Sequence, residues 1–206
     1  MFPQRLTEGY RAFLDERFAR EKGRYEALAE KGQSPEVMVI GCCDSRVSPE
    51  VIFDAIPGEL FVVRNVAGLV PPYQPDARYH GTSAALEYAV RVLKVKRIVV
   101  LGHAQCGGVR VMLEGAPREA QDFVEPWMKL ATPALMALPA DIAGDAALAR
   151  GEEEVVKLSL HNLRSFPWIR EAEGKGDLAL EGFHFGIRSG VLTRLDGDRF
   201  VPVPVA

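Results

Sequence analysis

The stretch Val37-Met38-Val39-Ile40-Gly41-Cys42-Cys43-Asp44-Ser45-Arg46 decides the fold of this chain. It begins as an apolar, β-branched run and ends in two thiols, an acid and a base. A second stretch has the same design: Arg97-Ile98-Val99-Val100-Leu101-Gly102-His103-Ala104-Gln105-Cys106-Gly107-Gly108. Apolar runs of this kind, ending in Gly-rich turns, are typical of buried parallel strands. We therefore expect an α/β sheet with chemically active residues at the carboxyl ends of its strands.

The polar ends of these two stretches indicate a metal site. Ligands of an open α/β sheet bind at the carboxyl edge of its strands. If the two strands are neighbours, Cys42, His103 and Cys106 converge on one point. Two thiolates and one imidazole suit zinc, and three protein ligands leave the fourth position open, as in catalytic zinc sites. Strand alternation turns Cys43 away from that point, so we expect it to be a small core residue.

The composition bounds the class of protein. The chain has 206 residues, 48% of them hydrophobic, and is expected to form one domain. A formal net charge of −3 without a basic block argues against a nucleic-acid partner. No segment is apolar enough to span a membrane, and the N-terminus lacks the apolar core of a signal peptide, so we expect a cytoplasmic protein. Three cysteines argue against a disulfide framework.

The N-terminal residues 4–31 are predicted to form one or two amphipathic helices, with Gly23 as a plausible break. This arm precedes the first strand, so it is not a crossover between strands. Its aromatic stripe must be covered either by the arm's own domain or by a second subunit. Both readings are open from the residues alone.

The rest of the chain is predicted to form alternating strands and helices. A strand at 60–66, a helix at 82–93 and the strand at 97–102 predict a right-handed, parallel β-α-β unit. Helices are expected near 107–114, 119–138 and 152–165, the last opening with the favourable charges of Glu152, Glu153 and Glu154. Residues 177–186 and 190–195 are interpreted as a closing strand and hairpin. We expect a mostly parallel sheet of four to five strands flanked by helices, within a single domain 1–206 made of an arm (1–32) and a core (33–206).

Asp44 and Arg46 stand two and four residues after the first candidate ligand. A carboxylate this close to zinc could occupy the open position, or a charge-assisted pair with Arg46 could hold it ionised and off the metal. With the acid held aside, zinc would carry a water of lowered pKa and present hydroxide at neutral pH. Asp44 would then orient that hydroxide toward an electrophile.

Together these residues resemble the β-class carbonic anhydrases. The resemblance rests on Cys42-x-Asp44-Ser45-Arg46 and His103-x-x-Cys106-Gly107-Gly108 and covers roughly residues 30–170. Further matching segments are Gly32–Pro35, Pro57–Glu59, Phe61–Ala67, Val70–Tyr73, Gly81-Thr82, Glu87–Val90 and Asn162-Leu163.

The resemblance implies reversible hydration of carbon dioxide to bicarbonate and a proton, with one Zn²⁺ per subunit. It implies a homodimer or dimer of dimers, with the N-terminal helices over the neighbouring subunit and the site at the subunit interface. By position, Gln33 would donate a hydrogen bond to a substrate oxygen, while an apolar pocket would hold carbon dioxide. The substrate-binding residues implied are Gln33, Phe61, Val66, Tyr88 and Gly102.

Some members of that family have a regulatory bicarbonate pocket made of a Trp, an Arg and a Tyr. The matching positions here are Val39, Arg64 and Phe185, so only the arginine is kept. We therefore favour a site in which Asp44 stays off the zinc, and we expect Arg64 to have a structural role.

Two other functions are compatible with the pattern. A relative on the same scaffold could hydrolyse carbonyl sulfide or carbon disulfide, since hydroxide attack on these linear molecules is the same step. A non-catalytic zinc or thiol sensor would use the cysteines but would not need Asp44 or Arg46. The other histidines, His80, His161 and His184, are expected to be ordinary loop, helix-surface and strand residues, with His184 as a candidate for the rim of the site.

Overall fold

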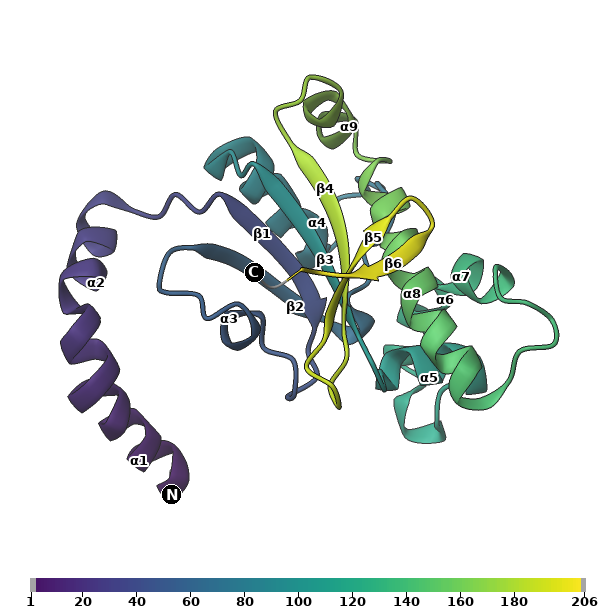
Figure 1. Cartoon of the computed structure of the whole chain (residues 1–206). Coiled ribbons are helices and arrows are strands. Elements are labelled where there is room, and N and C mark those ends of the chain that lie inside the picture. The colour runs from purple at the N-terminus through teal and green to yellow at the C-terminus, as the bar shows by residue number, and fades with distance from the viewer. Residues whose placement is uncertain (1–2, 205–206) are drawn as a thin grey trace.

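The computed structural model describes residues 3–204 and shows a twisted six-stranded sheet with helices packed against it (Figure 1). The strands are β1 (Val37–Cys42), β2 (Leu60–Asn65), β3 (Arg97–His103), β4 (Ala179–Phe185), β5 (Leu192–Asp196) and β6 (Arg199–Pro202). Their order is β2-β1-β3-β4-β5-β6. The first four are parallel, and β5 and β6 continue the sheet antiparallel to their neighbours. This confirms the predicted α/β class and mostly parallel sheet.

The sheet has one strand more than the four to five expected. The additional strand, β6, pairs with β5 through a tight turn at Gly197. Its four residues are mostly exposed, so they lack the apolar alternation by which a strand is recognised in a sequence. The predicted closing strand and hairpin correspond to β4 and β5.

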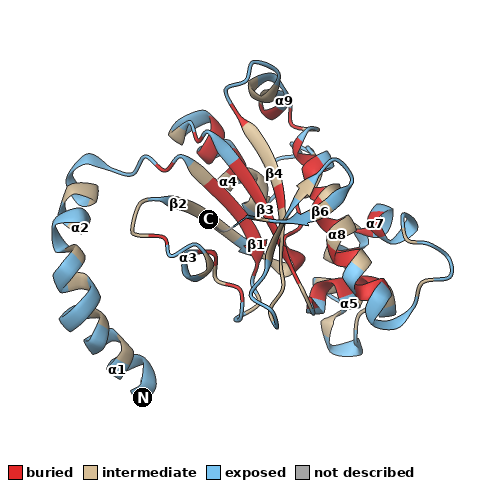
Figure 2. Cartoon of the chain, in the orientation of Figure 1, coloured by how far each residue is buried: buried red, intermediate tan, exposed pale blue. Residues whose placement is uncertain are grey.

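One face of the sheet carries the main hydrophobic core. Inward side chains of β1 and β3, such as Met38, Ile40, Ile98 and Val100, pack against two helical segments. These are α8 (Gly144–Leu163) and the continuous helix formed by α4 (Gly81–Glu87) with the π-helix Tyr88–Leu93. The other face buries a smaller cluster of Val39, Val99 and Leu101. Figure 2 shows the buried residues concentrated in β1, β3 and α8.

The remaining α-helices outside the N-terminal arm have four to eight residues each. They are α3 (Pro49–Ile52), α5 (Gly107–Glu114), α6 (Val124–Lys129), α7 (Thr132–Met136) and α9 (Pro167–Gly174). The helix expected at 119–138 is therefore split into a 3₁₀ turn (Arg118–Ala120), α6 and α7. The helix expected to start at Glu152 starts at Gly144 instead, so the Glu152 run lies in its middle. Among residues 3–204, no helix combines the length and apolarity that a membrane span requires.

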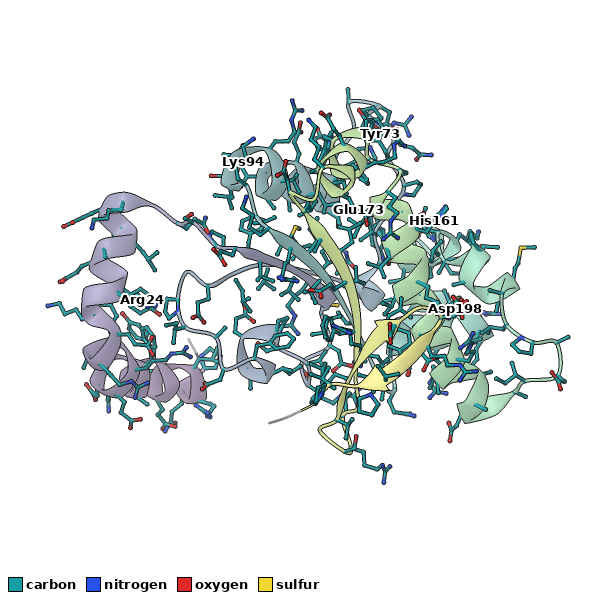
Figure 3. All side chains as sticks on the ribbon, turned by 45° about the horizontal axis from the view of Figure 1, so that its top comes forward. Arg24, Tyr73, Lys94, His161, Glu173 and Asp198 are labelled. Carbon is teal, nitrogen blue, oxygen red and sulfur yellow. The ribbon has the colours of Figure 1, made fainter. Side chains whose placement is uncertain are left out.

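The N-terminal arm is one long helical segment that stands away from the sheet (Figure 1). It consists of α1 (Gln4–Ala12), a π-helix (Phe13–Phe18) and α2 (Ala19–Lys31), with no break at Gly23. None of its described residues is buried. It meets the core through Arg17 and through Arg24 (labelled in Figure 3), which donate to the carbonyls of Ala55 and Pro57.

Candidate metal centre

The structure brings Cys42, His103 and Cys106 together at the carboxyl edge of β1 and β3. Their potential ligand atoms all lie within 4.8 Å of one another, and the two Sγ atoms are 4.0 Å apart. All three residues are buried. Cys42 is the last residue of β1 and His103 the last of β3, which are neighbouring parallel strands. The predicted convergence is confirmed.

A tight turn after β3 brings the third residue back to the first two. Gln105 adopts the left-handed conformation (φ +58°), and Cys106 has extended backbone angles immediately before α5. Gly107 and Gly108 then begin that helix. A Cβ added at Gly108 would lie 2.9 Å from Ala67 Cβ and from Val66 Cγ1, so this helix can approach the strand ends only with glycine there.

The His103 ring is oriented for ligation. Its Nδ1 lies 2.9 Å from the carbonyl oxygen of Ala104, which requires a proton on Nδ1 and leaves Nε2 with a free lone pair. Of the buried side-chain nitrogen and oxygen atoms in residues 3–204, His103 Nε2 alone has no hydrogen-bond partner. An unpartnered imidazole nitrogen facing two thiols fits a zinc ion, whose coordination would satisfy it.

The thiols of Cys42 and Cys106 are buried side by side, and their pKa values shift in opposite directions. The Cys106 side chain, acting as hydrogen-bond donor, lowers the pKa of Cys42. The Cys42 thiolate and burial together raise the pKa of Cys106. A divalent cation bound by both thiols would displace their protons, so binding of the metal would release protons.

Asp44 and Arg46 form a bidentate ion pair beside the candidate ligands. Arg46 Nε and Nη2 lie 2.9 and 2.7 Å from the two carboxylate oxygens, and the backbone N–H of Arg46 donates to Oδ1 at 3.0 Å. Arg46 also donates to the carbonyl of Gln105, 3.1 Å away, so it links the two loops that carry the thiols. The hydrogen bonds from Arg46 hold the pKa of Asp44 well below its usual range.

Arg64 holds the backbone of the same loop. From β2, its Nε donates to the carbonyl of Cys42 at 2.8 Å and its Nη2 to the carbonyl of Asp44 at 2.6 Å. These contacts agree with the structural role expected for Arg64, which is to hold the backbone at Cys42 and Asp44. Val39, by contrast, is buried in the smaller core cluster, and Phe185 packs at its edge.

Three of the predicted substrate residues lie away from the metal ligands within one chain. Gln33 is exposed and precedes β1, at the opposite end of that strand from Cys42. Phe61 pairs with Met38 near the start of β2, and its ring stacks on Tyr88 with centroids 6.0 Å apart. At 3.3 Å per residue, Phe61 is roughly 13 Å along the strand from the end that carries the ligands.

The other two predicted substrate residues are close to the metal ligands. Val66 follows β2, and its carbonyl accepts a hydrogen bond from Trp127 Nε1 at 2.9 Å. Gly102 precedes His103, but its side-chain direction faces α8, where an added Cβ would lie 2.6 Å from Val156 Cγ2. Gly102 therefore allows β3 and α8 to pack closely.

Cys43 is not the small core residue that was expected, since its side chain is exposed. It lies just beyond the end of β1, where its backbone N–H donates to the carbonyl of Asn65. Its position one residue beyond the strand leaves it outside the group of Cys42, His103 and Cys106. Partial burial and the nearby Cys42 thiolate raise the pKa of Cys43.

The remaining histidines differ in their surroundings. His161 is exposed on α8 (Figure 3), and His80 pairs with Asp76 in the loop before α4. His184 lies on β4, where Nε2 is 3.1 Å from Glu152 Oε2. It thus neighbours the metal centre through one intervening residue.

Glu152 is a buried acidic neighbour of Cys106 that the sequence pattern did not predict. It is 3% exposed, and its Oε1 accepts the backbone N–H of Cys106 at 3.0 Å. Three consecutive glutamates are typical of a helix N-terminus, so the pattern predicted an exposed first turn at Glu152. Glu152 lies at helical spacing from Leu148 and Val155, and a charged residue on such an apolar side of a helix needs a specific partner.

Comparisons with known proteins agree on one family. The model of the carbonic anhydrase family matches residues 37–192. The protein described as β carbonic anhydrase 3 of Arabidopsis thaliana is 36% identical over 194 residues, an alignment that covers 91% of this chain and 74% of that protein.

Solved structures give the same result over nearly the whole chain. The β-carbonic anhydrase CcaA superposes with a TM-score of 0.89 at 31% identity, covering 98% of this chain and 92% of that one. The Coccomyxa β-carbonic anhydrase, solved in complex with acetazolamide, gives 0.82 at 29% identity with coverages of 97% and 87%. One of two tetrameric β-carbonic anhydrases of the ascomycete Sordaria macrospora gives 0.78 at 29% identity, with coverages of 92% and 94%.

Proposed function

Since the chain belongs to the β-carbonic anhydrase family and is a carbonic anhydrase, a lyase, we propose that it binds one Zn²⁺ per subunit through Cys42, His103 and Cys106. The proposed reaction is the reversible hydration of carbon dioxide to bicarbonate and a proton. The observation that carries the zinc assignment is the unpartnered, buried Nε2 of His103 facing two thiols.

Held by Cys42, His103 and Cys106, a zinc ion would supply a hydroxide nucleophile near neutral pH by lowering the pKa of a bound water to about 7. Arg46 and Asp44 would position the nucleophile. Arg46 engages both carboxylate oxygens of Asp44, which keeps this acid ionised and directed away from the metal. Asp44 then serves as the hydrogen-bond acceptor that orients the attacking oxygen. This pair supports an enzyme over a thiol sensor, which has no need for it.

We further propose that a second subunit completes the substrate pocket. Gln33, Phe61 and Tyr88 lie at the opposite end of the strands from the ligands, so one chain cannot gather them around its own metal centre. The exposed N-terminal arm and the tetrameric state of the Sordaria relatives support an oligomer. In such an assembly these three residues, together with Val66 and Gly102 near the ligands, would form the carbon dioxide site.

Stopped-flow hydration of carbon dioxide, with zinc content measured on the same sample, tests the proposal. We expect activity in the parent protein, and a loss of roughly 10²–10⁴-fold in Asp44→Ala and Arg46→Ala with zinc retained. Arg110→Ala is the matched control, because Arg110 pairs with Glu114 on the surface of α5. Full zinc occupancy without hydration activity, together with hydrolysis of carbonyl sulfide or carbon disulfide, would contradict the proposed substrate.

A further inference from the structure

A buried carboxylate lies directly behind the candidate metal centre. Glu152, in the middle of α8, is 3% exposed, and its two oxygens have different partners. Oε1 accepts the backbone N–H of Cys106 at 3.0 Å, and Oε2 lies 3.1 Å from His184 Nε2. A carboxylate only accepts hydrogen bonds, so His184 Nε2 is the donor.

The Cys106 N–H has no alternative partner among regular elements. Cys106 lies between the left-handed Gln105 and the first turn of α5, so neither strand pairing nor helix bonding uses its amide. A buried amide without an acceptor is destabilising, and the turn would rearrange to reach one. Glu152 therefore determines the backbone orientation of the residue that carries the second thiolate.

His184 in turn determines the rotamer of Glu152. Its ring lies over Gly102, where an added Cβ would be 3.5 Å from Cδ2, and it packs edge-on against Phe200 with centroids 6.3 Å apart. Its carbonyl accepts from Thr193 Oγ1 at 3.2 Å, which ties β4 to β5 at this point. The imidazole thus contacts residues of β3 and β6 while it donates to the carboxylate.

We infer that Glu152, fixed by His184, is a positioning residue that sets the direction of Cys106 Sγ toward the metal. This inference rests on the zinc site proposed above and deepens it. Residues that orient metal ligands from behind typically change metal affinity by 10–100-fold when removed. Glu152 acts here through the backbone of its ligand and does not touch the substrate.

The test is zinc affinity of the full-length protein, measured by competition with a chromophoric chelator, together with the thiolate-to-cobalt absorption of the Co²⁺ form. Glu152→Ala should weaken zinc binding roughly 10–100-fold and shift or weaken the cobalt band. Glu152→Gln should restore both, since its amide oxygen still accepts from Cys106. His184→Ala should act in the same direction as Glu152→Ala, and His184→Gln should restore binding because its amide can donate to Glu152.

Glu153→Ala is the matched control, as Glu153 is next in the same helix but faces Arg150. Urea unfolding of the metal-free variants separates loss of folding from loss of affinity. Parent-like zinc affinity and cobalt spectrum in folded Glu152→Ala would overturn the inference, as would equal losses in Glu152→Ala and Glu152→Gln. A parent protein that binds no zinc would instead overturn the proposed function itself.

Discussion

At the scale of single residues, the arginine side chains organise the metal centre. Arg46 and Arg64 together donate to the Asp44 carboxylate and to the backbone carbonyls of Cys42, Asp44 and Gln105. Planar guanidinium groups suit such multiple contacts, which a lysine could not reproduce. The acid beside the candidate metal ligands is therefore held by geometry as well as by charge.

The depressed pKa of Asp44 makes a prediction about stability and pH. Its pKa is lower in the folded than in the unfolded protein, so its ionised form stabilises the fold at any pH above the unfolded value of about 3.9. That contribution is lost as the pH falls from there toward the folded pKa. In urea unfolding of metal-free protein, the stability difference between the parent and Asp44→Asn should be constant from pH 8 to 5 and shrink below about pH 4. A difference that disappears between pH 7 and 5 would contradict the ion pair.

Cys43 gives a second prediction at this scale. Because its thiol is exposed and lies outside the Cys42–His103–Cys106 group, Cys43→Ser should retain zinc and hydration activity close to the parent level. Cys42→Ser is the matched comparison and should lose zinc. Metal analysis after dialysis measures both. Loss of zinc from Cys43→Ser would mean that the wrong cysteine of the pair was assigned as the ligand.

At the scale of elements, the close approach of α8 to β3 and β4 places Glu152 beside Cys106 of the candidate metal centre. Gly102 and Gly182 allow this approach, since a Cβ at either would lie within 2.8 Å of a Val156 methyl carbon. The same helix supplies Ser159 and Asn162, which bond to the backbone of Val70. One helix thus connects the sheet, the loop after β2 and the ligand loop.

Gly102→Ala tests this packing. The added methyl group should overlap Val156 and lower the free energy of unfolding by about 1–3 kcal/mol, as overpacking usually does. Val156→Ala alone should also destabilise, because it leaves a cavity. The double variant should be more stable than the sum of the two losses predicts. Urea unfolding of all four proteins measures this coupling, and strictly additive losses would contradict the contact.

At the scale of the whole molecule, the N-terminal arm has apolar side chains that the rest of its own chain does not cover. Leu6, Tyr10 and Leu14 form an apolar stripe with exposed fractions of 56%, 61% and 38%. Other arm aromatics pack on one another, with Phe18 and Tyr25 ring centroids 5.3 Å apart. A helix with such a stripe and few contacts to its own core is suited to pack on a second subunit.

The arm predicts a change of assembly state. Leu6→Asp combined with Tyr10→Asp should shift the protein to a smaller assembly, because charges on the stripe would be buried against the partner. Light scattering after size exclusion measures this, and hydration activity should fall with it if the partner completes the site. Glu8→Ala, on the opposite side of α1, should change neither. An unchanged mass in the double variant would contradict the predicted contact.

The sequence by itself determined the parallel strands, the convergence of Cys42, His103 and Cys106, and the family. Apolar runs that end in ligand residues are local patterns, and adjacent parallel strands necessarily bring their carboxyl ends together. Only the tertiary structure decided that Glu152 is buried behind Cys106, that Cys43 is exposed, and that Gln33 and Phe61 lie far from the ligands of their own chain. These facts depend on which helix covers which strand end, and contacts between residues 46 positions apart, such as Cys106 and Glu152, leave no local pattern.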